Sequence, residues 1–380
     1  MNMKLPKVAF FSTMGWGGTE KVVVNLLNEL VKYPISLQLV VPKKQEKFLR
    51  LHDIPPEVSI VELPSNAGAY RLKMVFPLIQ YLQREKPSIL VSNLTQYNVI
   101  APIAKLVTGF PRRLILVEHL GFKSLEEPLK NDPKEKVGLV RFLRRLFYNN
   151  ADVVAGVSQS LAQEIESELK WHPGRVKVLY NPVIDEKLRL KAQEPLEHPW
   201  FQPGQPPVFL GVGRFVPQKD FPTLIQAFAL LRQRHAARLV ILGEGSEEAR
   251  KSLEDLIAQL NLKDDILLPG FTDNPYAYMS RSTAFVLSSE FEGLPTVIIE
   301  ALACGCQVVS TDCPHGPNEI LMGERYGRLV PVADAQALAD AMEKVIADPI
   351  DPDFLKLRAQ DFTVEKVTLD YLKVMNLPCD

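Results

Sequence analysis

Short apolar runs alternate with amphipathic stretches along most of the chain. In the first half, apolar runs of strand length have the composition of buried parallel strands. Residues 19–32 repeat apolar side chains at helical spacing, which predicts an amphipathic helix after the first strand. Strands are expected at 8–11, 37–41, 88–92, 113–118, 152–158 and 176–180.

A second series of the same kind follows a break in the pattern. Residues 185–207 are rich in proline and charge and show no sustained period, which indicates a linker or an irregular crossing. Strands are then expected at 208–213, 238–243, 265–270, 284–289, 307–311 and 328–332, with helices at 220–233, 247–260, 274–281, 295–304 and 334–347.

This order predicts two α/β domains in series, each a doubly wound, Rossmann-like parallel sheet. We expect them to span 1–184 and 185–353, with the helical segment within 354–380 crossing back to the first domain. Ligands of such sheets bind outside the carboxyl ends of the strands, so a central cleft where the two sheets face each other is the expected site.

Composition narrows the functions that fit this fold. The net charge of −1 gives the chain no general attraction for nucleic acid. No apolar run approaches the roughly 18–20 residues that span a bilayer, and MNMKLPKVAFFST predicts a first strand rather than a signal peptide, so a cytoplasmic location is expected. Cys304, Cys306 and Cys313 match no usual zinc spacing with His315, so no metal is expected.

Two loops carry glycine or basic residues directly after a predicted strand. Gly17 and Gly18 open the first helix, where free amides can bind a phosphate, or where the glycines simply form a tight turn. In the second domain Gly213 ends a strand, Arg214 follows it, and Lys219 comes five residues later. These two cations can converge on one diphosphate, because both belong to a loop at the carboxyl edge.

Two glutamates and a histidine complete the candidate chemistry. Glu292 lies in a loop and Glu300 in the following helix, so they form either a pair for vicinal hydroxyls or two unrelated surface acids. His119 ends a strand of the first domain, where it can donate to a sugar hydroxyl, carry a proton, or be merely hydrogen-bonded. Residues 312–319 form an irregular loop beside the same edge.

Taken together, these motifs resemble those of retaining GT-B glycosyltransferases of family 4. The E-x7-E element of that family matches Glu292 and Glu300, and its R-x4-K pair matches Arg214 and Lys219. Its N-terminal glycine loop and its Asn-Pro-Val match "GGTEKV" at 17–22 and residues 181–183. The likeness covers most of the chain and is strongest over 205–335.

The resemblance implies a role for each matched residue. Arg214 and Lys219 would hold the diphosphate of a nucleotide sugar, and Glu300 would bind its ribose hydroxyls. Glu292 and, from the first domain, His119 would contact the donor sugar. The remaining donor-binding positions implied are Gly17, Gly18, Asn181, Gly213, Phe271, Gly293, Leu294, Pro295 and Thr296.

The reaction implied is metal-independent transfer of a hexosyl or N-acetylhexosaminyl group, with retention of configuration, from a UDP-linked sugar. The acceptor implied is a hydroxyl of a lipid-linked or cell-surface glycan. The Asp-x-Asp pair of metal-dependent transferases has its match only at 351–353, in a C-terminal connection, so no cofactor is expected.

Residues 134–150 combine basic and apolar side chains at helical spacing. Lys134, Lys136, Arg141, Arg144 and Arg145 accompany an apolar stripe. The segment is either a helix on an anionic membrane surface, at the inner face of the cell membrane, or a helix packed on the sheet with its basic side in water.

Two other classes of protein share the fold and stay open at this point. A nucleotide-sugar epimerase would use the same cleft, although the combined R-x4-K and E-x7-E elements favour transfer. A non-catalytic nucleotide-sugar binding protein would keep the same donor contacts. A dinucleotide-dependent oxidoreductase is disfavoured, because no GxGxxG with a following acid is present.

Overall fold

The structure is a computed structural model that describes residues 5–13, 17–43, 53–64, 71–121 and 135–379. It divides into two compact units. Unit 1 comprises Met1–Pro182 and Val364–Asp380, and unit 2 comprises Val183–Thr363. The chain therefore passes from unit 1 to unit 2 and returns for its last helix.

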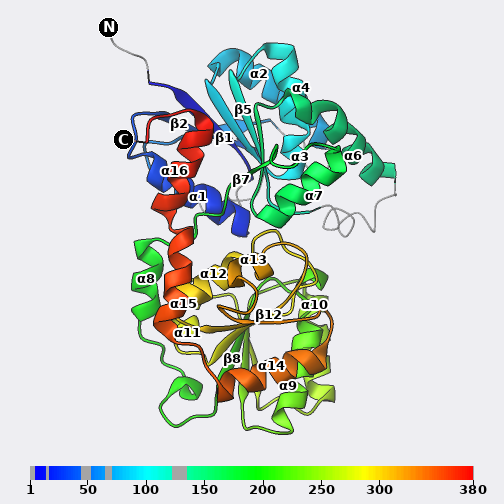
Figure 1. Cartoon of the computed structure of the whole chain (residues 1–380), viewed down its shortest axis with the longest axis vertical. Helices are drawn as coiled ribbons and strands as arrows, with labels where there is room; N and C mark the ends of the chain where they lie inside the picture. The colour runs from blue at the N-terminus through cyan, green and yellow to red at the C-terminus, as the bar shows by residue number, and fades with distance from the viewer. Residues whose placement is uncertain (1–4, 14–16, 44–52, 65–70, 122–134, 380) are drawn as a thin grey trace. The chain divides into compact units, whose positions relative to one another are not determined.

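Unit 1 is built on a parallel sheet. Its described strands number seven, in the order β3-β2-β1-β4-β5-β6-β7 (Figure 1). They are β1 (Lys7–Phe11), β2 (Ser36–Pro42), β3 (Ser59–Leu63), β4 (Ile89–Asn93), β5 (Arg113–Glu118), β6 (Val153–Gly156) and β7 (Lys177–Val178). The apolar side chains of β1, β4 and β5 are almost fully buried, as expected for central parallel strands.

The helices of unit 1 connect these strands. They are α1 (Gly18–Leu30), α2 (Val75–Glu85), α3 (Thr95–Asn98), α4 (Ile100–Thr108), α6 (Glu135–Phe147), α7 (Gln159–Leu169) and α16 (Val364–Met375). The last of them, α16, packs beside α1, and the Arg113 side chain at the start of β5 donates to the carbonyl of Val374, 2.5 Å away. These contacts fasten the returning chain to unit 1.

Unit 2 repeats the architecture with six described strands, in the order β10-β9-β8-β11-β12-β13 (Figure 1). They are β8 (Val208–Val212), β9 (Arg238–Leu242), β10 (Ile266–Gly270), β11 (Ala284–Leu287), β12 (Gln307–Thr311) and β13 (Arg328–Val330). The helices are α8 (Glu186–Gln193), α9 (Phe221–Arg232), α10 (Glu247–Gln259), α11 (Pro275–Met279), α12 (Thr296–Ala303), α13 (Pro317–Leu321), α14 (Ala335–Ala347) and α15 (Pro352–Ala359).

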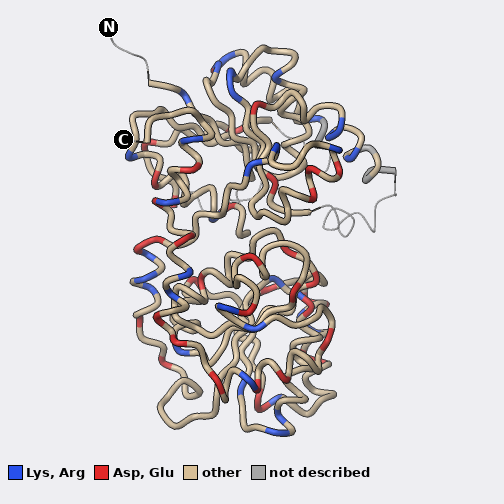
Figure 2. Tube along the Cα trace, viewed as in Figure 1, with Lys and Arg blue, Asp and Glu red and all other residues tan. Residues whose placement is uncertain are grey.

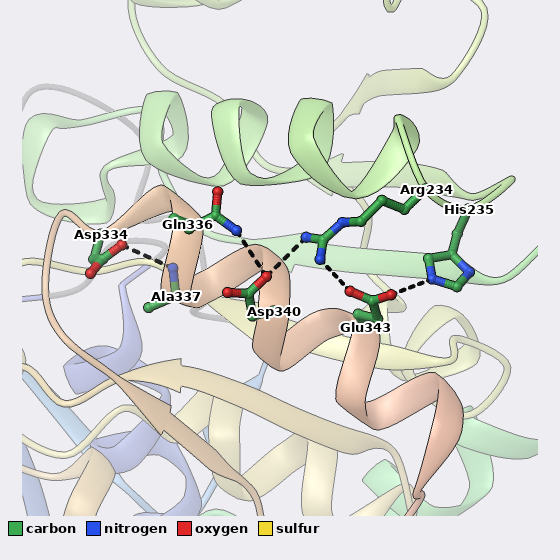
Figure 3. A network of polar contacts seen from close by, with 7 residues as sticks. All are labelled: Arg234, His235, Asp334, Gln336, Ala337, Asp340 and Glu343. Carbon is green, nitrogen blue, oxygen red and sulfur yellow. Dashed lines mark hydrogen bonds and ion pairs between the residues drawn. The ribbon is translucent and has the colours of Figure 1, made fainter.

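Helices α9 and α14 pack together on the sheet of unit 2. Phe228 and Leu231 of α9 and Met342 of α14 are fully buried in the core between them. A polar network fastens the same pair at its surface (Figure 3). Arg234 donates to Asp340 (3.0 Å) and to Glu343, and His235 pairs with Glu343 (2.7 Å). Arg234 and His235 lie just before β9, so this network is at the amino end of that strand. It stabilises the fold and lies away from the carboxyl ends of the strands.

The structure confirms the alternating pattern and corrects two details of it. Residues 186–193 form helix α8, within the segment expected to be a linker, because Asp185 caps this helix at the amide of Leu188. Strand β3 has no strong alternation in the sequence, and three of its five residues are exposed or nearly so, which hides it from pattern analysis.

The boundaries of the units also differ from those expected. The first lies between 182 and 183 rather than between 184 and 185. The second lies between 363 and 364, so only α16 returns to unit 1, and the expectation that all of 354–380 crosses back is wrong for 354–363. Helix α15 stays in unit 2 because it packs against α12.

None of the helices in the described ranges is both long enough and apolar enough to traverse a lipid bilayer.

Candidate active site

Three loops of unit 2 meet at one edge of its sheet. Strands β8, β11 and β12 are neighbours and run parallel, so the loops that follow them leave the sheet side by side. These loops are 213–220, 288–295 and 312–316. They contain most of the residues that the sequence singles out in this half of the chain.

Lys219 and Glu292 are brought together across two of these loops. Lys219 Nζ lies 2.6 Å from Glu292 Oε1, and both side chains are largely buried, with 15% and 9% exposed. Ser289 Oγ, fully buried, donates to the same carboxylate oxygen at 2.8 Å. In the described part of the chain Glu292 Oε2 accepts no hydrogen bond, so one oxygen is anchored while the other stays available.

Backbone contacts hold the two loops in this arrangement. The amide of Glu290 donates to the carbonyl of Gln218, and the Gln218 side chain donates to the carbonyl of Phe291, both at 2.9 Å. Ser288 Oγ donates to the carbonyl of Lys219 at 2.7 Å. The position of Lys219 therefore depends on the loop after β11 as well as on its own loop.

The third loop supports Glu292 from the other side. The amide of Glu292 donates to the carbonyl of Pro314 at 3.0 Å. Gly316, with φ +94°, packs so closely that a Cβ atom there would lie 2.4 Å from Pro295 Cδ and 3.1 Å from the carbonyl oxygen of Gly293. Only glycine fits this position, which explains the irregular sequence of the loop. Cys313 in the same loop is buried, and burial raises the pKa of its thiol to about 12, with a contribution from the Glu292 carboxylate.

Two further glycines shape the end of β8. The side chain of Lys219 lies across Gly213, where a Cβ atom would be 3.2 Å from Lys219 Cε. Gly243, with φ +146°, follows β9 and lies against the same residue: a Cβ atom on Gly243 would be 1.8 Å from the carbonyl oxygen of Gly213. The Lys219 side chain can therefore lie directly against the backbone at the end of β8, because Gly213 has no side chain there.

The other residues predicted in unit 2 lie around this pair. Arg214 is in the same loop as Lys219 with its side chain exposed, whereas Glu300 is buried on α12, about one turn from its start. Residues 293–295 form the loop that leads into α12, and Thr296 begins the helix. Phe271 directly follows β10 and is 47% exposed. Among these predicted residues, Lys219 and Glu292 form a direct ion pair.

The predicted residues of unit 1 lie at the carboxyl edge of its own sheet, or beyond it. Gly17 caps α1 and Gly18 is its first residue. The Glu20 carboxylate turns back over this end: it accepts from Thr13 Oγ1 at 2.7 Å, and a Cβ atom on Gly17 would lie 2.3 Å from its Oε2. An anion at the start of α1 would therefore have to displace Glu20. Asn181 is buried just before the end of the first segment of unit 1.

His119 is buried, with 6% of its surface exposed. Its Nε2 lies 3.1 Å from Asn93 Oδ1. Burial lowers the pKa of the imidazole from 6.5 to about 4, so the ring is neutral at physiological pH. A neutral imidazole offers one hydrogen-bond donor and one acceptor, and no charge.

Sequence analysis missed a buried cluster next to His119. Glu118, fully buried, accepts from Thr95 Oγ1 at 2.6 Å and from the hydroxyl of Tyr148. Arg144 lies 3.6 Å from the same carboxylate and stacks on the ring of Tyr148. Burial, and then the Glu118 carboxylate, raise the pKa of Tyr148. The one signal in the sequence was an acid at the end of an apolar strand.

This cluster corrects the interpretation of Arg144. The sequence groups it with the basic residues of a helix surface, but the side chain is fully buried because it pairs with Glu118 and Glu168. Arg145 is exposed, as are Phe142 and Leu146, which are 60% and 52% exposed. Figure 2 marks the basic residues of α6 in blue. Lys134 lies outside the described residues.

No cluster of three histidine, cysteine or acidic side chains suited to a metal ion occurs in the ranges that the structure describes. Cys306 is buried just before β12, and burial raises the pKa of its thiol. Cys304, at the end of α12, is partly buried. The described residues offer an ion pair and a serine hydroxyl in unit 2 and, separately, a neutral imidazole in unit 1.

Two family models match the chain, one over each half. Residues 16–187 match the model described as Glycosyltransferase Family 4. Residues 193–361 match Glycosyl transferases group 1, which covers nearly the whole of unit 2. The two matched ranges meet close to the boundary between the units.

Curated relatives match over almost the full length. The chain is 30% identical over 380 residues to the N-acetylgalactosamine-N,N'-diacetylbacillosaminyl-diphospho-undecaprenol 4-alpha-N-acetylgalactosaminyltransferase of Campylobacter jejuni, covering 96% of this chain and 98% of that protein. It is 26% identical to the lipopolysaccharide core biosynthesis glycosyltransferase LpsE of Rhizobium meliloti, covering 90% of this chain and 89% of that protein.

Solved structures show the same fold. The lipopolysaccharide outer core galactosyltransferase WaaB in its apo form superimposes with a TM-score of 0.74 at 21% identity, covering 97% of this chain and 99% of that one. Anabaena Alr3699/HepE in complex with UDP-glucose gives 0.75 at 19% identity, with the same two coverages. The chain belongs to the glycosyltransferases of group 1 and family 4, and its two Rossmann-like α/β units form the GT-B fold.

Proposed function

We propose that this glycosyltransferase moves a hexosyl or N-acetylhexosaminyl group from a UDP-linked sugar to a hydroxyl of a lipid-linked glycan, with retention of the anomeric configuration and without a metal ion. The names of several relatives support this substrate class. The Campylobacter jejuni relative is named for transfer of alpha-N-acetylgalactosamine to a diphospho-undecaprenol-linked sugar, and LpsE for lipopolysaccharide core biosynthesis. HepE has been solved with UDP-glucose.

The observation that carries the proposal is the buried ion pair of Lys219 and Glu292 at the carboxyl edge of unit 2. In this proposal the pair would hold a cation beside the leaving diphosphate, which gains negative charge as the glycosidic bond breaks. A preorganised cation in a site that excludes water stabilises that charge strongly. Glu292 Oε2 can accept a hydrogen bond from a sugar hydroxyl while Oε1 keeps the lysine in place.

The other residues of unit 2 extend this arrangement along the donor. Arg214 would share the diphosphate with Lys219, because its guanidinium offers a fork of donors from the same loop. Glu300 would accept from the ribose hydroxyls, and Phe271 would lie beside the base. Strands β10 and β11 are three strand spacings apart, roughly 14 Å at the usual separation, so an extended nucleotide sugar can reach both.

In unit 1, His119 would contact the donor sugar, with Gly17, Gly18 and Asn181 contributing to the same ligand. The neutral imidazole suits an uncharged hydroxyl better than a phosphate. Glu20 over the start of α1 favours a hydroxyl there as well, since a carboxylate repels an anion.

Helix α6 supports a peripheral contact with the membrane that would hold a lipid-linked acceptor. Phe142 and Leu146, four residues apart, are exposed on this helix, and Arg145 is exposed beside them. Exposed apolar and basic side chains on one helix suit insertion among anionic headgroups. The proposal includes a cytoplasmic location at the inner face of the membrane.

A donor panel with and without acceptor tests the proposed function. UDP and GDP sugars are incubated with the protein and a short polyprenyl-diphosphate-linked acceptor, in the presence of EDTA, and the anomeric configuration of the product is read by NMR. Transfer with a UDP sugar, retention and full activity in EDTA are expected. Epimerised donor would instead favour an epimerase, and tight binding without turnover a binding protein.

One variant tests donor binding separately from chemistry in the same assay. Glu300→Gln should raise the KM for the donor with little change in kcat, because the ribose contacts form equally in the ground state and the transition state. Equal effects on both constants would contradict the role proposed for Glu300.

A further inference from the structure

We propose that Asn93 is a positioning residue that fixes His119 in its Nε2–H tautomer, so that Nδ1 is presented as a hydrogen-bond acceptor. The inference rests on the proposed function, in which His119 contacts the sugar, but its first test needs no substrate. It concerns a residue that no feature of the sequence marks, since Asn93 is one of several polar residues in "VSNLTQYN".

The register of the sheet brings the two side chains together. Strands β4 and β5 are parallel neighbours, and Asn93, the last residue of β4, pairs with Val117 of β5. His119 follows two residues later, where β5 has ended. Asn93 is fully buried, and its Oδ1 lies 3.1 Å from His119 Nε2. The contact therefore joins the last residue of β4 to the residue that directly follows β5.

The amide oxygen determines which ring nitrogen holds the proton. A carbonyl oxygen of an amide can only accept, so Nε2 must carry the hydrogen. Because burial keeps the ring neutral, Nδ1 then has a lone pair and no proton. No charged group contributes to that pKa, and the nearest carboxylate along the chain, Glu118, is engaged with Thr95, Tyr148 and Arg144.

The second ring nitrogen is left open toward a ligand. In the part of the chain that the structure describes, Nδ1 has no hydrogen-bond partner, yet it is not among the fully enclosed polar atoms. Asn93 Nδ2, by contrast, is enclosed without a partner, as are Ser12 Oγ and Ser92 Oγ on the neighbouring strand ends. The orientation of Asn93 thus leaves its own amide group unsatisfied while it holds the imidazole.

A hydroxyl group that donates a hydrogen bond is the ligand that this arrangement fits. His119 accepts that bond at Nδ1, so it discriminates against a sugar whose hydroxyl is methylated or replaced by fluorine, which have no hydrogen to give. This differs from the role expected from the sequence, in which the histidine donates to the hydroxyl.

The tautomer can be measured directly on the free protein. Long-range ¹H–¹⁵N correlation spectra of protein labelled in its histidine rings distinguish a protonated from an unprotonated ring nitrogen, and His119→Gln identifies the resonance among the six histidines. We expect Nε2 protonated and Nδ1 unprotonated between pH 6 and pH 8. A protonated Nδ1, or a mixture of tautomers in the native protein, overturns the proposal whatever the activity.

Two variants of Asn93 test the positioning role. Asn93→Leu removes the acceptor and should give mixed tautomers and on the order of a tenfold loss in kcat, which is the size of one hydrogen bond. Asn93→Asp keeps an acceptor at the same place, so it should restore the Nε2–H tautomer. Its carboxylate should also raise the pKa of His119 and move the acid limb of the pH–rate profile toward neutrality.

Asn98→Leu is the matched control. Asn98 is also fully buried, but its side chain donates to the carbonyl of Val117 at 2.9 Å, whereas the hydrogen bond to the imidazole involves Asn93. It should lower the melting temperature without changing the tautomer. If Asn98→Leu alters the spectrum as Asn93→Leu does, or if Asn93→Leu keeps the native tautomer, Asn93 has only a structural role. A correct tautomer with no transfer to any acceptor would instead count against the proposed function alone.

Discussion

The carboxyl edges of the two sheets carry opposite kinds of chemistry. In unit 2 the edge holds a charged pair, Lys219 and Glu292, whose loops are joined to each other by hydrogen bonds to the backbone. In unit 1 the edge holds a neutral imidazole, His119, and the charges next to it are turned inward, where Glu118 meets Arg144. At these residues the same Rossmann-like architecture therefore presents a charged pair in one unit and a neutral polar group in the other.

This difference follows from the hydrogen-bond partners that each unit provides for a buried ionisable side chain. A buried ion pair retains its charges only when hydrogen bonds and a partner offset the loss of water. Unit 2 supplies them with Ser289 and two cross-loop contacts, whereas His119 has one neutral partner and loses its proton instead.

The largest expected effect is on Lys219. Lys219→Ala should lower kcat by about 10²–10³-fold, the usual loss when a preorganised donor to a developing anion is removed. Donor binding measured by calorimetry should change less. Lys251→Ala, at an exposed lysine of α10, is the control for a lost positive charge. An unchanged kcat in Lys219→Ala would contradict the proposal that the charged edge of unit 2 stabilises the leaving diphosphate.

The neutral half of the comparison predicts a loss of stability in acid. The neutral, buried His119 contributes fully to the free energy of unfolding above pH 6.5. This contribution is lost as the pH falls from 6.5 toward about 4, because in that range the unfolded chain binds a proton that the folded protein does not. The full difference corresponds to about 3 kcal/mol. Denaturant unfolding of the native protein and of His119→Gln at pH 7 and pH 4.5 measures it, and parallel curves would show that the ring is not buried neutral.

Glu168 provides a control of opposite sign in the same unit. Burial raises the pKa of its carboxyl from 4.5 to about 7. Its contribution to stability is therefore present below pH 4.5 and is lost as the pH rises through 7. Glu168→Gln should make the loss of stability on acidification steeper. Protonation of Glu168 no longer offsets the destabilisation that His119 causes at low pH.

The close packing of the charged edge predicts a difference between two glycines of unit 2. Gly243→Ala should lower the free energy of unfolding by about 3 kcal/mol, because its Cβ atom would collide with the carbonyl of Gly213. Gly204→Ala, also at positive φ but with no atom within 4 Å, should cost only about 1 kcal/mol. Urea unfolding measures both variants. Equal losses in the free energy of unfolding would mean that Gly243 does not pack tightly against the backbone at the end of β8.

The smallest expected effect concerns the membrane contact of unit 1. Arg145→Gln should weaken binding to vesicles that contain anionic lipid by about fivefold, since one basic residue near such a surface contributes about 1 kcal/mol. Arg175→Gln, an exposed arginine outside α6, should change nothing. Sedimentation with vesicles measures both, and equal losses would point to net charge rather than to α6.

Pattern alone was sufficient for the order of the strands in unit 2. Its strands are short apolar runs bounded by glycine, proline or polar residues, so each strand and most helices are found within a few residues of their predicted places. The pattern failed at α8 and β3, where the apolar signal is weak because few of the side chains are buried. Boundaries between units depended on which helix packs where, which is why α15 was assigned to the wrong one.

The sequence by itself determined the family, the parallel sheets and the residues that carry charge to their carboxyl edges, because these follow from periodicity and from motifs local in the chain. Only the tertiary structure decided which of those residues meet. Lys219 and Glu292 are 73 residues apart, and their contact depends on the adjacency of β8 and β11. The burial of Arg144 and the contact between Asn93 and His119 were likewise invisible, since register and burial arise only when strands and helices pack together.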